Sequence, residues 1–166
     1  LVPNGTKLVS GSADGTVMVW NRSTGERLMT INDSSGRIRD IDVDAIGSSV
    51  IGAGDDGIVR EWDLDSGNVS REYGGDDMTK TFFTVQYILD DTAILGMRSN
   101  SAMVWDRKSG NLLYESGEIV GETAFHPNDD TALTIITFYG TFDDGTQKAF
   151  SSARPVRWDL KTGDIV

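Results

Sequence analysis

Residues 16–25 read TVMVWNRSTG, and the second half of this stretch returns three more times along the chain. Each copy is a Trp with Asn or Asp next to it, Ser or Thr at the fourth following position and Gly at the fifth. The four copies are WNRSTG, WDLDSG, WDRKSG and WDLKTG, and they begin at Trp20, Trp62, Trp105 and Trp158. Their spacings are 42, 43 and 53 residues, and they use every Trp of the chain. The chain is therefore a repeat of four units.

The residues before the first three Trp predict β-hairpins. A short apolar run, a turn of Asp, Asn, Gly or Ser, and a second alternating run follow one another, as in SVIGAG at 49–54, the turn at 55–57 and IVREW at 58–62. The same order starts at 6 and at 92. Gly, Asn and Asp tolerate the positive φ that tight hairpin turns need. We expect each Trp on the inward face of its second strand.

The residues after each Trp predict two further strands. The Ser/Thr-Gly turn leads into third strands at 26–31, 68–73, 111–115 and from 164 onward. Fourth strands are expected at 38–43, 82–89 and 122–125. No stretch carries apolar residues at helical spacing over three turns. The unit is thus four antiparallel strands in about 42 residues, and the fold class is all-β.

Period, Trp and turn chemistry together give the chain a resemblance to the WD-repeat β-propeller family. This resemblance implies about four four-stranded antiparallel blades of a larger ring. One feature of the family is missing, the Gly-His pair before each inner strand. In the family this His joins a Ser or Thr, an Asp and the Trp in a buried network, of which only parts such as Ser10, Asp14 and Trp20 remain. We therefore expect apolar packing, more than that network, to stabilise the blades.

The repeat also predicts the domain organisation. Residues 1–166 form one partial propeller with blade units at approximately 1–36, 37–81, 82–118 and 119–166. Propeller rings close with more blades than this, commonly about six to eight. Two arrangements remain open, a segment of a longer chain or two copies that close one ring. The last unit is about ten residues longer, which predicts either an extended hairpin around 140–147 or a projection that binds a partner.

Composition excludes several kinds of site. With 26 acidic against 15 basic residues, the net charge is −11, which disfavours direct nucleic-acid binding. No apolar run approaches the ~20 residues of a membrane span. The chain has no Cys and a single His, His126, so we expect no disulfide, no metal site, no cofactor and no catalytic residues. Acidic pairs such as Asp55-Asp56 favour turn chemistry, with weak calcium sites or catalysis as alternatives.

These observations predict a non-catalytic protein–protein interaction scaffold in a multi-subunit assembly, intracellular and cytoplasmic, with the nucleus as the other location. The alternative is a propeller-type enzyme domain, quinoprotein- or lactonase-like, whose site lies largely outside this segment. Partners would be other proteins, together with the remaining blades of a longer chain or a second copy. In such a ring, the turns between the second and third strands of each unit emerge on the same rim as the connections from one unit to the next. We predict that this rim is the surface that binds a basic or mixed-charge partner. The residues proposed to bind it are Asp76, Asp77, Tyr139, Phe142, Asp143 and Asp144.

Overall fold

The computed structural model describes residues 2, 5–32, 34, 36–75, 80–99, 101–115, 123–125, 131–141 and 147–159, with side chains through 115. These residues form fourteen strands and no helix, which confirms the all-β class. None of the described segments is a helix long and apolar enough to cross a membrane.

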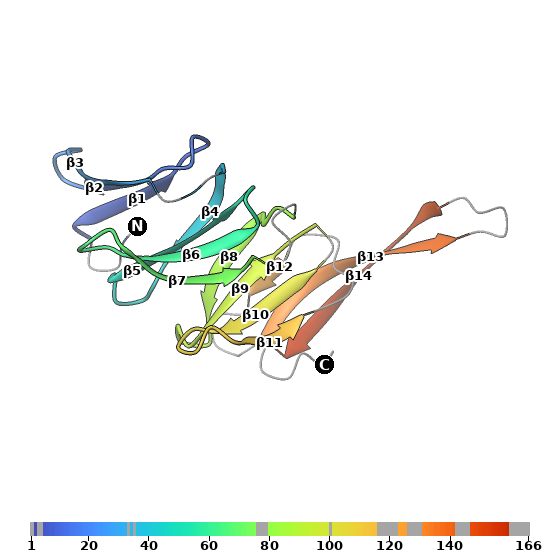
Figure 1. The fold of residues 1–166 in the computed structure, drawn as a ribbon. Helices are drawn as coiled ribbons and strands as arrows, with labels where there is room; N and C mark the ends of the chain where they lie inside the picture. The colour runs from blue at the N-terminus through green and yellow to red at the C-terminus, as the bar shows by residue number, and fades with distance from the viewer. Residues whose placement is uncertain are drawn as a thin grey trace.

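The strands form four antiparallel sheets that follow one another along the chain (Figure 1). In every sheet the strands lie side by side in sequence order. The first sheet contains β1 (Lys7–Gly11), β2 (Val17–Asn21) and β3 (Arg27–Ile31). The second contains β4 (Ile38–Val43), β5 (Ser49–Gly54), β6 (Ile58–Asp63) and β7 (Val69–Gly74). The third contains β8 (Thr84–Ile88), β9 (Ala93–Met97), β10 (Ala102–Asp106) and β11 (Leu112–Glu115), and the fourth β12 (Thr123–Phe125), β13 (Thr131–Thr141) and β14 (Gln147–Asp159).

Most strands lie within one residue of the predicted bounds, and the strand expected at 82–89 differs most. The strand expected at 82–89 begins only at Thr84, because the amide of Phe82 donates to the carbonyl of Gly54 in the second sheet, 3.0 Å away. At Phe82 the chain is still crossing between sheets. The long last hairpin is extended, since β13 and β14 remain paired from Thr131–Asp159 to Thr141–Gln147, and it projects beyond the other sheets (Figure 1).

The turn after each described Trp explains why the six residues from Trp to Gly, here called the Trp frame, repeat along the chain. The side chain of the residue after Trp accepts the amide two or three positions on; Asp63 accepts Ser66 N at 2.7 Å, and Asp106 accepts Ser109 N at 2.7 Å. The Gly that ends the frame has φ near +75°, as at Gly67, a conformation that costs glycine little. The frame is thus a turn signal between the third and the outer strand of a sheet.

The expected inward position is confirmed for two Trp residues. Trp62 and Trp105 are 1% and 2% exposed, and each ring lies over a Gly of the adjacent strand. Trp20 is only half-buried, because it lies on the face of β2 opposite to the one that packs on the second sheet. Its Nε1 donates to Ser10 Oγ at 3.0 Å, whereas Trp62 Nε1 has no partner among the described residues. Trp158 lies in β14, whose side chains are outside the description.

Apolar side chains join consecutive sheets face to face. Between the first and second sheets the buried cluster includes Val17, Val19, Val50, Trp62 and Leu64. A second cluster between the second and third sheets includes Ile51, Val59, Phe82, Val85 and Trp105. Burial of such apolar surface is the main favourable term in folding. The first three sheets are therefore stacked as a repeat, in which each one derives stability from its neighbours.

Carboxylates also link two of the sheets. Asp40 Oδ2 on β4 accepts the amide of Val85 at 3.0 Å, and Asp42 Oδ2 accepts the amide of Tyr87 at 2.9 Å. Burial raises the pKa of Asp42, although the amide hydrogen bonds from Tyr87 and Val43 act in the opposite direction. The edge of β8 that faces β4 thus has acceptors for its amides in the neighbouring sheet.

The close approach of Trp62 to β5 predicts that Gly52 cannot be enlarged. A Cβ on Gly52 would lie 2.8 Å from Trp62 Cζ3 and 3.1 Å from Cη2. We expect Gly52→Ala to lower the free energy of unfolding by about 1–3 kcal/mol, since the buried ring has no room to move. Equilibrium urea unfolding measures this change, and a variant as stable as the parent would contradict the placement of the ring.

Candidate functional site

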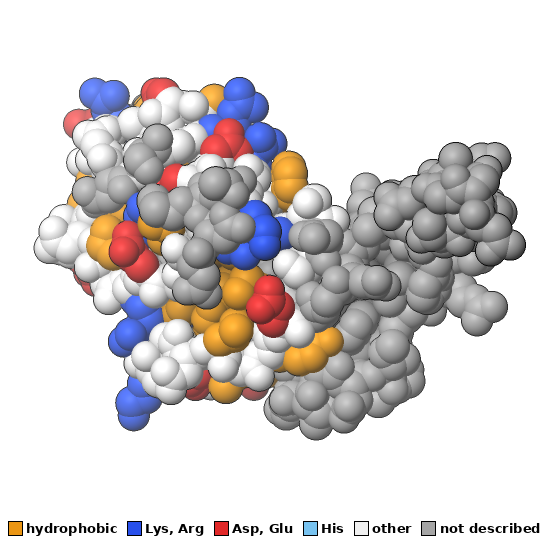
Figure 2. Space-filling model, turned by 45° about the vertical axis from the view of Figure 1, so that its right-hand side comes forward, with side chains coloured by type: hydrophobic (Ala, Val, Ile, Leu, Met, Phe, Trp, Pro, Cys, Tyr) orange, Lys and Arg blue, Asp and Glu red, His pale blue; other side chains and the backbone are white. Residues whose placement is uncertain are grey.

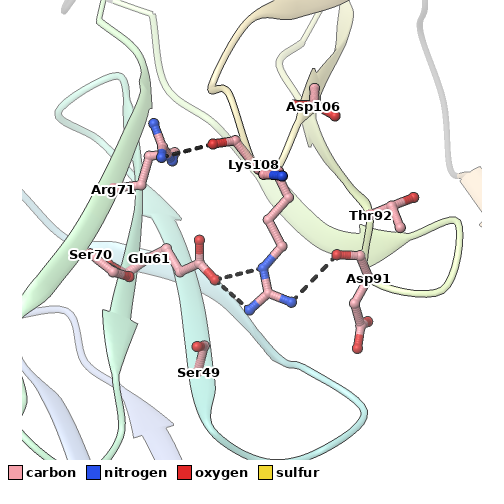
Figure 3. Close-up of a pocket in the computed structure, with 9 residues that line it drawn as sticks. Ser49, Glu61, Ser70, Arg71, Asp91, Thr92, Asp106 and Lys108 are labelled. Atoms are coloured by element: carbon pink, nitrogen blue, oxygen red, sulfur yellow. Dashed lines mark hydrogen bonds and ion pairs between the residues drawn. The ribbon is translucent and has the colours of Figure 1, made fainter.

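A pocket of about 640 Å³ opens where the second and third sheets meet (Figure 3). Its walls come from β5, β6 and β7 on one side and from the turns before β9 and after β10 on the other. All nine lining side chains carry a charge or a hydroxyl group. They are Ser49, Glu61, Ser70, Arg71, Asp91, Thr92, Asp106, Arg107 and Lys108.

Glu61 is the centre of a hydrogen-bond network at the base of this pocket. The residue lies on β6 and is only 5% exposed. Its carboxylate accepts the hydroxyls of Tyr73 at 2.9 Å and of Tyr87 at 3.0 Å, and the Nε of Arg107 at 2.8 Å. Burial, and next the charge of Glu61, raise the pKa of both tyrosines. Both hydroxyls therefore stay protonated and act as donors.

Arg107 connects this network to the turn before β5. Its Nη2 lies 2.6 Å from Glu61 and 3.1 Å from Asp44, and its Cζ lies 4.7 Å from the centre of the Tyr87 ring. Burial opposes the charge of Arg107, but the hydrogen bond to Glu61 and the surrounding acids leave its pKa raised. Asp44 is fully buried, yet hydrogen bonds from Ser48, Ser49 and Arg107 lower its pKa. Asp44 and Arg107 thus stay ionised inside the joint.

The charged groups at the base of the pocket are paired with other groups of the same chain, which limits what the pocket can do chemically. Glu61 and Arg107 neutralise each other, and Arg71 donates to the backbone oxygens of Lys108 at 2.9 Å and Ser109 at 3.3 Å (Figure 3). Among the described residues no three His, Cys, Asp or Glu side chains are placed to hold a metal ion. The arrangement holds the third sheet to the second and leaves a mixed-charge recess at the surface.

This network was not among the expectations from the sequence, although the repeat carries a signal for it. The position before Trp and the second position after the next Trp meet across a joint: Val19 and Leu64 share one apolar cluster, and Glu61 and Arg107 form the ion pair. From the first joint to the second, the residues at both positions change together from apolar to charged. Once the structure shows which positions meet, a comparison of the units position by position indicates an ion pair in the second joint.

The turn at the edge of the pocket is strained. Leu89, Asp90 and Asp91 have φ values of 54°, 52° and 62°, so three consecutive residues lie in the left-handed region, which residues other than Gly adopt singly and not in runs. Asp91 is held there, because its Oδ2 accepts the amide of Ala45 at 2.7 Å. The strained turn thus holds Asp91 against the second sheet at this pocket.

Relief of that strain is a testable expectation. We expect Asp90→Gly to raise the free energy of unfolding by about 0.5–1 kcal/mol, since glycine adopts positive φ without a steric cost. Asp91→Gly is the matched control: it also relieves strain but loses the bond to Ala45, so it should not stabilise. Chemical denaturation of both variants measures the difference, and a less stable Asp90→Gly protein would contradict the strain.

The residues predicted to bind a partner lie mostly outside the description. Residues 76, 77 and 142–144 are not described, which covers Asp76, Asp77, Phe142, Asp143 and Asp144. Tyr139 lies in β13, where its backbone pairs with Ala149, and its side chain is not described. The pocket instead lies on the rim formed by the turn between β8 and β9 and the turn between β10 and β11. That is the rim opposite to the predicted one, which holds the turns between the second and third strands of each unit.

Comparison with known proteins agrees with the repeat. The family model described as WD domain, G-beta repeat matches residues 1–21. The chain is 25% identical over 187 residues to nuclear distribution protein PAC1-2 of Uncinocarpus reesii, which covers 96% of this chain and 37% of that protein. It is 25% identical over 158 residues to eukaryotic translation initiation factor 3 subunit I of Caenorhabditis briggsae, covering 93% of this chain and 47% of that protein.

A shorter match has a higher sequence identity. The chain is 37% identical over 71 residues to mitogen-activated protein kinase kinase kinase A of Dictyostelium discoideum, covering 42% of this chain and 8% of that protein. In all three relatives the match spans less than half of the relative's length. The matches confirm the resemblance to WD-repeat proteins, and the four antiparallel sheets are propeller-like.

Proposed function

We propose that this protein is a non-catalytic scaffold that binds other proteins within a multi-subunit assembly, inside the cell. WD-repeat relatives support an interaction role in general, and one of them is named as a subunit of translation initiation factor 3. The observation that carries the proposal is the joint between the second and third sheets, where Glu61, Arg107 and Asp44 lock neighbouring sheets together. Rigid sheets hold their connecting loops in a fixed array, as a binding surface requires.

The partner surface that we propose is the rim with the long hairpin. Tyr139 or Phe142 would insert into the partner, and the acidic residues Asp76, Asp77, Asp143 and Asp144 would steer a basic or mixed-charge protein toward this rim. Truncation of an aromatic residue should then raise the dissociation rate, whereas reversal of the acidic charges should lower the association rate. Further blades of a longer chain, or a second copy, are additional partners in this proposal.

The test replaces residues 139–142 by Gly-Ser in the full parent protein and measures which proteins co-purify with it. We expect one or more partners to be lost. The matched control replaces Ser23 and Thr24, which are exposed in the turn between β2 and β3 on the opposite rim, by glycines. Retention of every partner at the parent's level by the 139–142 variant would show that this rim is not the interface.

A further inference from the structure

The mouth of the pocket between the second and third sheets differs chemically from its base. At the base, Glu61 and Arg107 pair with each other inside the joint. The pocket volume of about 640 Å³ lies within the range of ~300–1,000 Å³ in which proteins hold small ligands. Toward the solvent, five of the lining residues are half-buried or exposed. They are Ser70, Asp91, Thr92, Asp106 and Lys108.

Two hydroxyl groups at this mouth can act only as acceptors. Ser70 Oγ donates its hydrogen to the backbone oxygen of Glu61 at 3.0 Å, and Thr92 Oγ1 donates to that of Leu89 at 2.6 Å. A hydroxyl group has one hydrogen, so each of these oxygens has only lone pairs left to offer. Ser70 and Thr92 lie on opposite sides of the pocket (Figure 3). A ligand that bonds to them therefore has to be a donor.

Two carboxylates at the mouth each keep one oxygen available. Asp91 Oδ2 accepts the amide of Ala45 at 2.7 Å, and Asp106 Oδ1 accepts the amide and the hydroxyl of Ser109 at 2.7 and 2.6 Å. Within the described part of the chain, Asp91 Oδ1 and Asp106 Oδ2 have no hydrogen-bond partner. The hydrogen bonds from Ser109 lower the pKa of Asp106, so this carboxylate is ionised at neutral pH. Both residues thus offer an oxygen to a donor.

The basic residues of the pocket leave room for a further positive charge. Arg107 is balanced by Glu61 and Asp44, and Arg71 is fixed on two backbone oxygens of the third sheet. Lys108 is exposed, and its flexible side chain can turn toward the solvent. More acidic than basic residues line the pocket or act electrostatically on its residues. These acids are Asp42, Asp44, Glu61, Asp91 and Asp106.

The rest of the surface attracts cations less specifically than this mouth does. The chain carries a net charge of −11, which favours basic partners in general. On the face shown in Figure 2, however, acidic and basic side chains are interspersed. Specific recognition of a guanidinium needs acceptors at fixed positions. The pocket has such acceptors, because they lie on β7, on the turn before β9 and at the end of β10.

We propose that this pocket receives the side chain of an Arg from a partner protein, with the guanidinium donating to Asp91 and Asp106. The proposal rests on the scaffold function above and adds a second contact, on the rim opposite to the long hairpin. An Arg side chain presents five N–H donors and no acceptor, which matches a mouth lined by accepting oxygens. A guanidinium is also more weakly hydrated than the ammonium group of Lys, so it loses less on leaving water.

Binding titrations with defined peptides test the proposal on the full parent protein. The probes are fluorescein-labelled peptides with the core Gly-Ala-Arg-Ala-Gly and versions with citrulline, Lys or Glu in place of Arg, and the readout is fluorescence anisotropy. We expect the arginine peptide to bind more tightly than the other three. Citrulline keeps the shape of Arg and lacks its charge, so the difference between these two peptides measures what the charge contributes.

Asp106→Asn and Asp63→Asn form a matched pair of variants. Both residues follow a Trp at the same position of the repeat, but only Asp106 lines the pocket. Asn can hold this turn, as Asn21 does in the first unit by accepting the amide of Ser23 at 2.9 Å. We expect Asp106→Asn to weaken binding of the arginine peptide about fivefold, the upper value for an exposed ion pair, and Asp63→Asn to leave it unchanged. Equal urea midpoints of unfolding for the two variants would separate binding from folding.

Several results would overturn the proposal. They are no binding of the arginine peptide, equal binding of the citrulline or lysine peptide, and equal affinity of the parent and Asp106→Asn for the arginine peptide. Tighter binding of the glutamate peptide would overturn it as well, since the pocket would then select an anion. Normal partner capture by the parent protein alongside any of these results would leave the scaffold function standing and remove only this site.

Discussion

Glu61→Val and Arg107→Leu, each introduced alone, are expected to lower the free energy of unfolding by about 3–5 kcal/mol. Arg107→Leu leaves Glu61 and Asp44 buried between two sheets without their cation, and Glu61→Val leaves the partly buried Arg107 with Asp44 as its acid, 3.1 Å away. The double variant should cost clearly less than the sum, because it recreates the apolar pair Val19 and Leu64 of the preceding joint. Equilibrium urea unfolding of the parent, the two single variants and the double variant gives the coupling energy directly.

One further variant and one control extend this double-mutant cycle. Loss of Glu61 leaves the Tyr87 hydroxyl without its acceptor, so Tyr87→Phe added to the double variant should recover further stability. The control is the ion pair of Lys7 and Asp65 at 3.1 Å, in which Asp65 is almost fully exposed. Breaking it should change stability by less than about 1 kcal/mol. Additive effects at Glu61 and Arg107 would contradict a buried pair at this joint.

Trp62→Ala is expected to lower the free energy of unfolding by about 3–5 kcal/mol. The side chain is 1% exposed and belongs to the cluster that joins the first and second sheets. Its Nε1 has no partner among the described residues, so the loss comes from the cavity and not from a hydrogen bond. Urea unfolding followed by circular dichroism measures the change.

Trp20 supplies the comparison for this prediction. It occupies the same position of the repeat but is half-buried, and its ring faces away from the second sheet. Trp20→Ala should therefore cost less than Trp62→Ala, although it also removes the hydrogen bond to Ser10. A change below about 1 kcal/mol at Trp62 would show that its ring does not fill the joint.

The local part of the fold could be read from the sequence because its causes are local. The Trp frame contains its own turn, in which Asp63 accepts the Ser66 amide and Gly67 takes the positive φ. Hairpin turns such as 55–57 likewise lie where Asp and Gly place them. These interactions join residues a few positions apart, so composition and spacing are sufficient to predict strands, turns and the repeat.

The candidate sites could not be read in this way, because their contacts join distant residues. Glu61 and Arg107 are 46 residues apart and meet only when two sheets stack. The sequence by itself determined the all-β repeat, its turns and the buried positions of Trp62 and Trp105. Only the tertiary structure decided which polar residues are buried together, as in the joint around Glu61, and which polar atoms have no partner among the described residues, as Trp62 Nε1 does. The physical reason is that burial and pairing of a charge depend on the neighbouring sheet, which the residue's own strand does not specify.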